Sequence, residues 1–239
     1  MISVCLASYN GEKNIRRQIA SILPQLAQDD ELIVSDDGST DETLAVVEGI
    51  GDSRIRIIAG PQKGLVRNFE HAIRAARGDI IFLSDQDDEW LPNKVVRMMA
   101  AFEKTSCPVV MHDVVVVRED GSVLYPSLFG ERGVRHGVFR NLVKSCWLGS
   151  AMAFRASLLT KALPIRGCAR GNMHDTWIGF VAEMNGGVFF LEEILGRYYR
   201  YTSSVTPTEL RPMSFPRQVQ KRLITAWNLL LYAYDRGVR

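Results

Sequence analysis

The sequence predicts an α/β protein with a doubly wound, mostly parallel sheet. Two observations support this prediction. Apolar strand-like runs alternate with amphipathic helix-like segments in the first half of the 239 residues, and several of these runs end in acidic or polar clusters. Ligands of such sheets bind beyond the carboxyl ends of the strands, so these clusters are the first candidates for a functional site.

Four strands alternate with four helices in the first half. The strands are predicted at 2–9, 31–39, 54–60 and 79–85, and the helices at 15–26, 39–50, 64–78 and 91–105. Ser39 and Glu42 have the spacing of a capping box at the start of the second helix. Gly78 can end the third helix, and Pro92 lies near the first turn of the fourth.

The second half is less regular. Residues 107–126 predict two strands joined by a hairpin turn at 119–121, and residues 148–163 a strand that runs into a helix. A helix is expected over 172–187, opening near Asp175, and a final pair of strands over 188–201. We therefore predict one domain over 1–205, with a regular half at 1–105 and a mixed half at 106–205. A proline-containing linker and an amphipathic helix follow over 206–239.

Composition indicates a soluble globular protein, because 46% of the residues are apolar and 23% are charged. A net charge of +2 is too close to zero to indicate binding to nucleic acid. The four cysteines are widely spaced and form no metal-binding pattern, so we expect a reducing, cytosolic compartment. The first residues do not have the pattern of a signal peptide, and no run approaches the ~18 apolar residues of a membrane span.

Asp85-Gln86-Asp87 directly follows the buried-type run at 80–83. Carboxylates one residue apart on an extended segment can share a cation, and Mg²⁺ is usually held by one or two carboxylates together with substrate phosphates. The alternative is an acidic turn that starts the next helix, since acids are favourable at helix N-termini. Asp88 and Glu89 fit either interpretation.

The ordered segments SVCLASYNGEKNIRRQIASIL, LIVSDDGSTDET, GLVRNFEHAIRAARGDIIFLSDQDDEWLPNKV and NMHDTW resemble the family 2 glycosyltransferases of the GT-A fold. The resemblance covers roughly residues 2–200. Among these enzymes, SDQDDEWLPNK and HDTW are most similar to bacterial rhamnosyltransferases of surface-polysaccharide synthesis.

This resemblance implies a donor site. Ser8 and Tyr9 match positions that contact the nucleotide base, and Asp36 or Asp37 would accept a hydrogen bond from N3–H of uracil or thymine. Arg67 lies where the family approaches the diphosphate, or is a solvated helix residue. The remaining matches are Asp85 and Gln86 for the nucleotide sugar, and Asp87 and Asp85 for a divalent metal, Mn²⁺ or Mg²⁺.

The resemblance also implies an acceptor site. Family 2 enzymes invert the anomeric centre, so the acceptor hydroxyl needs a general base, and Asp175 matches that position. Trp177, His174, Gly149 and Ser150 would contact the acceptor. The alternatives are a helix cap for Asp175, a core aromatic for Trp177, polar surface for His174 and a tightly packed strand for the 149–150 pair.

One departure concerns the diphosphate. Relatives often carry a histidine after Tyr-Arg-x, where it assists metal or diphosphate binding, and here Thr202 stands in its place. Arg200 and Thr202 remain as candidate diphosphate contacts. A hydroxyl is a poorer metal ligand than imidazole, so the identity of the metal stays open.

We thus expect an inverting transferase that uses a dTDP- or UDP-sugar and a glycan or lipid-linked glycan acceptor, and the subfamily resemblance implies dTDP-rhamnose as the donor. A nucleotidyltransferase and a catalytically silent binding relative are the alternatives. The expected location is the cytoplasm, at the inner face of the plasma membrane if the acceptor is lipid-linked. The helix at 218–234 is expected to pack on the domain, with anionic lipid or a dimer partner as alternatives.

Overall fold

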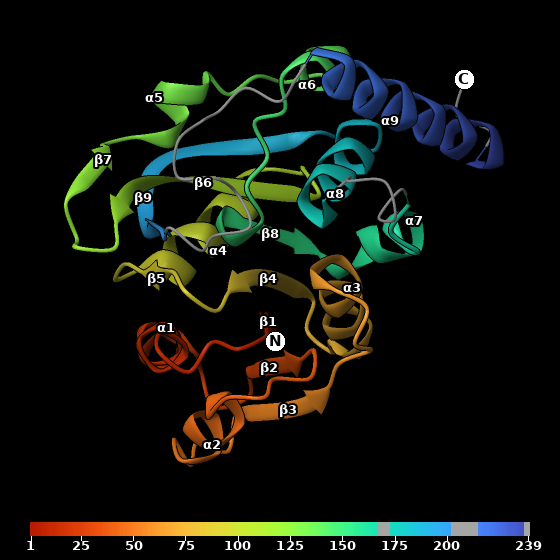
Figure 1. The fold of residues 1–239 in the computed structure, drawn as a ribbon. Helices are drawn as coiled ribbons and strands as arrows, with labels where there is room; N and C mark the ends of the chain where they lie inside the picture. The colour runs from red at the N-terminus through yellow and green to blue at the C-terminus, as the bar shows by residue number, and fades with distance from the viewer. Residues whose placement is uncertain (167–172, 202–214, 237–239) are drawn as a thin grey trace.

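A computed structural model describes residues 1–166, 173–201 and 215–236 of the chain (Figure 1). The described strands form one nine-stranded sheet in the order β3-β2-β1-β4-β8-β6-β9-β5, with β7 paired to β6. The strands of the first half are β1 (Ile2–Ser8), β2 (Glu31–Asp36), β3 (Ile55–Ala59) and β4 (Ile80–Asp85). They run parallel to one another, as the alternation of elements predicts.

Helices cover both faces of this parallel part. They are α1 (Ile15–Ile22), α2 (Thr43–Glu48), α3 (Leu65–Ala75) and α4 (Lys94–Lys104). Side chains alternate along a strand, so Cys5 and Ala7 of β1 join the core under α3, whereas Val4 and Leu6 join the core under α1. The doubly wound arrangement follows from that alternation.

The second half adds antiparallel pairs. Its strands are β6 (Val109–Arg118), β7 (Val123–Tyr125), β8 (Met152–Arg155) and β9 (Val188–Arg200), and the short β5 (Glu89–Trp90) of the first half pairs with β9. β8 lies antiparallel between β4 and β6, the predicted hairpin joins β6 to β7, and β6 and β9 are parallel.

The strand pair predicted at 188–201 is wrong, because β9 is a single strand of 13 residues. Its register against β6 shifts between His112 and Asp113 and again before Val115. Extra residues on one strand bend it locally. The end of β9 therefore also pairs with β5, where Glu89 lies opposite Arg197, and approaches the loop after β4.

The capping box predicted at Ser39 and Glu42 is also wrong. Helix α2 begins at Thr43, whose backbone N–H donates to Asp41 Oδ1 at 3.1 Å. Ser39 instead binds Asp36, as described below. The side chain that tightens the turn before α2 is therefore the aspartate between the two predicted residues.

Four helices complete the second half: α5 (Leu128–Arg132), α6 (Val138–Val143), α7 (Leu159–Ala162) and α8 (His174–Glu183). Only α7 and α8 were expected from the sequence. The segments before β8 and α7 form short 3₁₀ turns at Gly149–Ala151 and Ala156–Leu158. The first of these turns lies beside the start of α8 and becomes important at the site.

The last helix, α9 (Phe215–Arg236), lies along the edge of the molecule next to α6 and α8 (Figure 1). Leu229 and Tyr232 are buried, and the Tyr232 ring meets Trp177 of α8 edge to face. Asn185 Nδ2 donates to the Tyr232 hydroxyl at 3.0 Å. The helix therefore packs on the domain, as expected. None of the helices in the described ranges has the length and hydropathy needed to span a bilayer.

Candidate active site

Three carboxylates gather where β4 ends. Asp85 and Asp87 remain partly exposed, whereas Asp88 is buried. Burial and the neighbouring acids raise the pKa of Asp85 well above its usual range, and burial also raises the pKa of Asp87. Burial and the charge of Asp87 raise the pKa of Asp88 to about 7. The cluster thus holds more negative charge than its surroundings easily accommodate.

Lys94 lies against this cluster from the start of α4. Its side chain is 1% exposed, its Nζ donates to the Ser150 carbonyl at 2.9 Å, and it lies 4.1 Å from the centre of the Trp90 ring. Burial lowers the pKa of Lys94 to about 7, while the charges of Asp88 and Asp85 oppose that shift. Lys94 is therefore a buried basic group that interacts electrostatically with Asp88 and Asp85.

Gly149 and Ser150 connect the acid cluster to Asp175. The Ser150 hydroxyl hydrogen-bonds Asp88, and the Gly149 N–H donates to Asp175 Oδ2 at 3.2 Å. Asp175 lies in the first turn of α8, and its other oxygen accepts the Thr176 N–H. The charge of Asp175 contributes to the raised pKa of Asp85, so the two carboxylates belong to one electrostatic site.

Cationic and aromatic side chains surround Asp87. Arg17 of α1 donates from Nη2 to the Asp87 carbonyl at 2.6 Å and to the Tyr201 hydroxyl at 2.8 Å. Its guanidinium lies 4.0 Å from the centre of the Tyr199 ring. The charges of Arg17 and Arg200 both oppose the rise in the pKa of Asp87. The bend in β9 therefore brings its last residues to the acid cluster.

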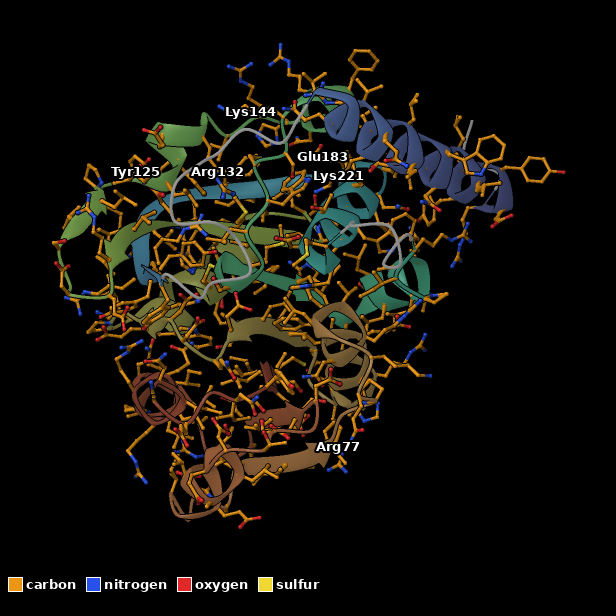
Figure 2. The ribbon with its side chains drawn as sticks, viewed as in Figure 1. Arg77, Tyr125, Arg132, Lys144, Glu183 and Lys221 are labelled. Atoms are coloured by element: carbon orange, nitrogen blue, oxygen red, sulfur yellow. The ribbon has the colours of Figure 1, made fainter. Side chains whose placement is uncertain are left out.

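Arg132 of α5 adds a further cation to this side of the sheet (Figure 2). Its Nη1 donates to the Trp147 carbonyl at 3.2 Å. Burial lowers the pKa of Arg132, and the charge of Asp175 opposes that change. Arg132 therefore lies within electrostatic range of the candidate base.

Asp36, at the end of β2, is committed to contacts within the protein. Its carboxylate accepts hydrogen bonds from the hydroxyls of Ser8 (2.9 Å) and Ser39 and from the backbone N–H groups of Gly38 and Ser39. Asp36 is 5% exposed. These contacts hold the ends of β1 and β2 together, which leaves Asp37 as the better candidate for a ligand contact.

Asp37 directly follows β2, is partly exposed, and contacts the residues before α3. Its carboxylate accepts the Gly64 N–H at 2.7 Å and the Lys63 N–H at 3.3 Å. Asn68, buried in α3, donates to the carbonyls of Ser35 and Ser8 and so fixes α3 to the same strand ends. This scaffold positions Asp37 beside the end of β1.

Tyr9 and Gln86 connect the loops after β1 and β4. The Gln86 side-chain amide accepts the Tyr9 N–H at 2.9 Å and donates to the Tyr9 carbonyl at 3.0 Å. The Tyr9 ring is 56% exposed and can stack on a flat ligand. Gln86 therefore supports Tyr9, and its amide groups are already used by the protein.

Two predicted acceptor contacts do not agree with the structure. Trp177 is 2% exposed, its indole N–H donates to the Ala162 carbonyl at 2.6 Å, and it packs in the core. His174 is 3% exposed and stacks on Phe69. Both residues are buried, because neighbouring elements enclose almost the whole of α8. The core alternative was the right one for Trp177.

The remaining predicted residues have three different outcomes. Arg67 pairs with Glu70 and its Nη1 lies 3.4 Å from the Ile165 carbonyl, so its guanidinium is engaged away from the acid cluster. Arg200 lies over the Tyr198 ring and within electrostatic range of Asp87. Thr202 lies outside the described residues.

The carboxylates after β4 have the chemistry of a site for a hard divalent cation. Asp85 and Asp87 offer oxygen ligands and both are partly exposed; burial and the neighbouring acids raise the pKa of Asp85, burial raises that of Asp87, and a bound cation would favour the charged form of both. Within the described ranges, no three histidine, cysteine, aspartate or glutamate side chains form a closed metal site. Two carboxylates that share the ion with phosphates are typical for Mg²⁺.

Comparison with known proteins agrees with this arrangement. Residues 3–161 match the model of glycosyl transferase family 2. The chain is 27% identical to an uncharacterized glycosyltransferase of Nostoc, over 83% of this chain and 64% of that protein. It is 28% identical to the Escherichia coli protein WfgD, named a UDP-Glc:alpha-D-GlcNAc-diphosphoundecaprenol beta-1,3-glucosyltransferase, over 62% of this chain and 57% of that protein. The chain thus spans about three fifths of these relatives.

Solved structures show the same fold. S. aureus TarS in complex with UDP-GlcNAc superposes with a TM-score of 0.68 at 20% identity, over 85% of this chain and 59% of that one. The mannosyltransferase PcManGT from Pyrobaculum calidifontis, in complex with GDP-Man and Mn²⁺, gives a TM-score of 0.64 at 18% identity, over 96% and 64%. The sheet is therefore that of the GT-A glycosyltransferases. With a family match over most of its length, the chain belongs to glycosyl transferase family 2.

Proposed function

We propose that the protein transfers a sugar from a nucleotide-diphosphate donor to a saccharide acceptor with inversion at the anomeric carbon. The observation that carries this proposal is the turn at Gly149–Ala151, which contacts Asp175 through the Gly149 N–H and the group beneath the acid cluster after β4 through the Ser150 carbonyl and Lys94. An acidic donor site and a separate carboxylate beside it are what an inverting transfer needs.

The donor would lie over the ends of β1, β2 and β4. Tyr9 offers an exposed ring to the base, and Asp37 offers a carboxylate to a base N–H group. Asp87 and Asp85 would hold Mn²⁺ or Mg²⁺, which supplies positive charge to the diphosphate when bound. Arg200 lies close enough to Asp87 to add a protein cation on the same side.

Asp175 would act as the general base. It takes the proton of the acceptor hydroxyl while that oxygen forms a bond to the anomeric carbon, and the bond from that carbon to the diphosphate oxygen breaks. The electron pair leaves with the nucleoside diphosphate. The Gly149 N–H donates to one carboxylate oxygen, so Gly149 positions the base. The neighbouring Ser150 hydroxyl hydrogen-bonds Asp88 and so connects the base to the acid cluster.

A uridine or thymidine donor is consistent with the base-contact residues. The names of WfgD and of the TarS complex refer to UDP-sugars, whereas that of PcManGT refers to GDP-Man with Mn²⁺. The sequence resemblance to rhamnosyltransferases favours including dTDP-rhamnose among the donors that are tested. The name of WfgD also supports testing a lipid diphosphate-linked glycan as acceptor, in synthesis of a cell-surface polysaccharide.

A panel of UDP-, dTDP- and GDP-sugars, assayed with and without Mn²⁺ and with saccharide acceptors, tests the proposal. We expect release of a nucleoside diphosphate and formation of a glycoside of inverted configuration. Release of pyrophosphate would indicate a nucleotidyltransferase instead. A product of retained configuration would refute the assigned role of Asp175.

A further inference from the structure

The outward side of α9 carries an apolar stripe that the fold leaves uncovered. Leu223, Trp227, Leu230 and Tyr234 are 66%, 63%, 64% and 85% exposed. Their spacing of four, three and four residues places them on one side of the helix. The buried side is carried by Leu229 and Tyr232 instead. Packing on the domain therefore uses only one side of α9.

Helix α6 extends this surface. Phe139 is 80% exposed and Val143 is 55% exposed. The two helices are joined where Arg222 Nη2 donates to the Val143 carbonyl at 2.6 Å. We call the exposed residues of α6 and α9 the α6–α9 face. Exposed apolar side chains gathered on two adjoining helices are the kind of surface that marks an interaction site.

The charges at the α6 end of the α6–α9 face are positive. Arg140 of α6 and Lys144 directly after it are exposed, whereas Lys221 and Arg222 of α9 are partly exposed and line the groove between α6, α8 and α9. Lys144 and Lys221 lie at the end of the molecule where α6 meets α9 (Figure 2). The sequence contains no aspartate or glutamate from 132 to 174 or from 210 to 234. An approaching partner therefore meets apolar and positive groups together.

We infer that the α6–α9 face docks on an anionic lipid bilayer. A helix that presents aromatic and aliphatic side chains beside lysine and arginine binds the interface of such a bilayer, by burial of apolar area and by attraction to acidic headgroups. A second copy of the chain is a poorer partner, because two such faces would bring like charges together.

The position of the α6–α9 face relative to the candidate active site indicates what the docking would do. A groove between α6, α8 and α9 is lined by Thr176 and Phe180 of α8 and by Lys221 and Arg222 of α9. Thr176 directly follows Asp175. Docking would thus present the acceptor side of the protein to the membrane, a consequence that rests on the proposed function. The docking itself does not.

Trp227 provides a direct optical probe for the docking. The other tryptophans, Trp90, Trp147 and Trp177, are at most 3% exposed, so Trp227 is the one whose surroundings change on binding. We expect its fluorescence to shift to shorter wavelength with phosphatidylglycerol-containing vesicles and to be quenched by lipids brominated on the acyl chain. Vesicles of phosphatidylcholine alone are expected to bind far more weakly.

Matched variants distinguish docking through the α6–α9 face from nonspecific adsorption to vesicles. The pair Trp227→Ser and Leu230→Ser removes apolar area, and the pair Arg140→Glu and Lys144→Glu reverses charge. Each pair should lower cosedimentation with anionic vesicles roughly tenfold or more. Val96→Ser, at a residue of α4 that is 66% exposed, is the apolar control and should bind as the parent does. Arg77→Glu, on an exposed residue far from α9, is the charge control (Figure 2).

Three results would overturn the inference. They are equal binding to neutral and anionic vesicles, parent-like binding by both pairs, and a stable dimer that the Trp227→Ser and Leu230→Ser pair dissociates. Transfer to a small water-soluble acceptor should be unchanged in all of these variants. A protein that binds vesicles but shows no transfer would contradict the proposed function and leave the docking intact.

Discussion

Replacing Lys94 by methionine tests the charge arrangement beneath the acid cluster. Methionine has a similar length and fills the space of the lysine stem, but it cannot donate to the Ser150 carbonyl or carry charge. Two effects on stability oppose each other in the variant. The cost of burying an ammonium disappears, and Ser150 O, Asp88 and Asp85 lose their buried cationic neighbour.

The pH dependence of the free energy of unfolding isolates the contribution of Lys94. Its pKa is about 7 in the folded protein and 10.5 ordinarily. Between these values the unfolded chain binds the additional proton, so the free energy of unfolding of the parent rises with pH. One group contributes at most about 1.4 kcal/mol per pH unit, or about 2 kcal/mol between about pH 7.5 and about pH 9. The methionine variant lacks this contribution.

Urea unfolding of the parent and the variant across that pH range measures the difference. The parent should gain up to about 2 kcal/mol relative to Lys94→Met as the pH rises. Lys104→Met, at an exposed residue at the end of the same helix, is the control and should show no such trend. A parent-variant difference that is constant or falls with pH would refute the assigned environment of Lys94.

Further changes test the parts of the site separately. Gln86→Ala removes both hydrogen bonds to the loop after β1, and we expect about tenfold weaker nucleotide binding by calorimetry with little loss of stability. Gly149→Ala would place a methyl group 2.7 Å from His174 Nε2 and 3.5 Å from the Asp175 Cβ, so the turnover number should fall by about ten- to a hundredfold; Gly130→Ala in α5 should leave it unchanged. Binding of Mn²⁺ should weaken as the pH falls from about 7.5 to about 5.5, because the carboxylates with raised pKa values must lose protons to bind it. Equal affinity at both values, measured by calorimetry, would exclude these carboxylates as ligands.

The parallel half of the fold could be predicted because its information is local. Apolar runs, helical periodicity and turn residues identified β1 to β4 and α1 to α4, and the position of Asp85 at a strand end follows from them. The long β9 could not be recognised in this way. Its bulges depend on pairing with β6 and β5, which are distant in the sequence.

The site was predicted in outline and missed in its supporting residues. Asp88 fits either interpretation of the sequence, and no motif distinguishes Arg17 and Lys94 from other helix residues. Each acquires its role from contacts across the fold, such as the 2.6 Å contact of Arg17 with the Asp87 carbonyl. Trp177 is the opposite case, because its position in the motif predicts a ligand contact and the structure buries it. The position of a residue in a motif does not show whether its side chain faces the core or the ligand.

The central claim is that Asp175 acts as the base in a transfer that begins on the acids after β4. The most direct test is the rate of nucleoside diphosphate release by Asp175→Asn, with saturating donor, acceptor and Mn²⁺. The claim predicts a fall of about a hundredfold or more with nucleotide affinity unchanged. A variant that retains the rate of the parent would contradict it.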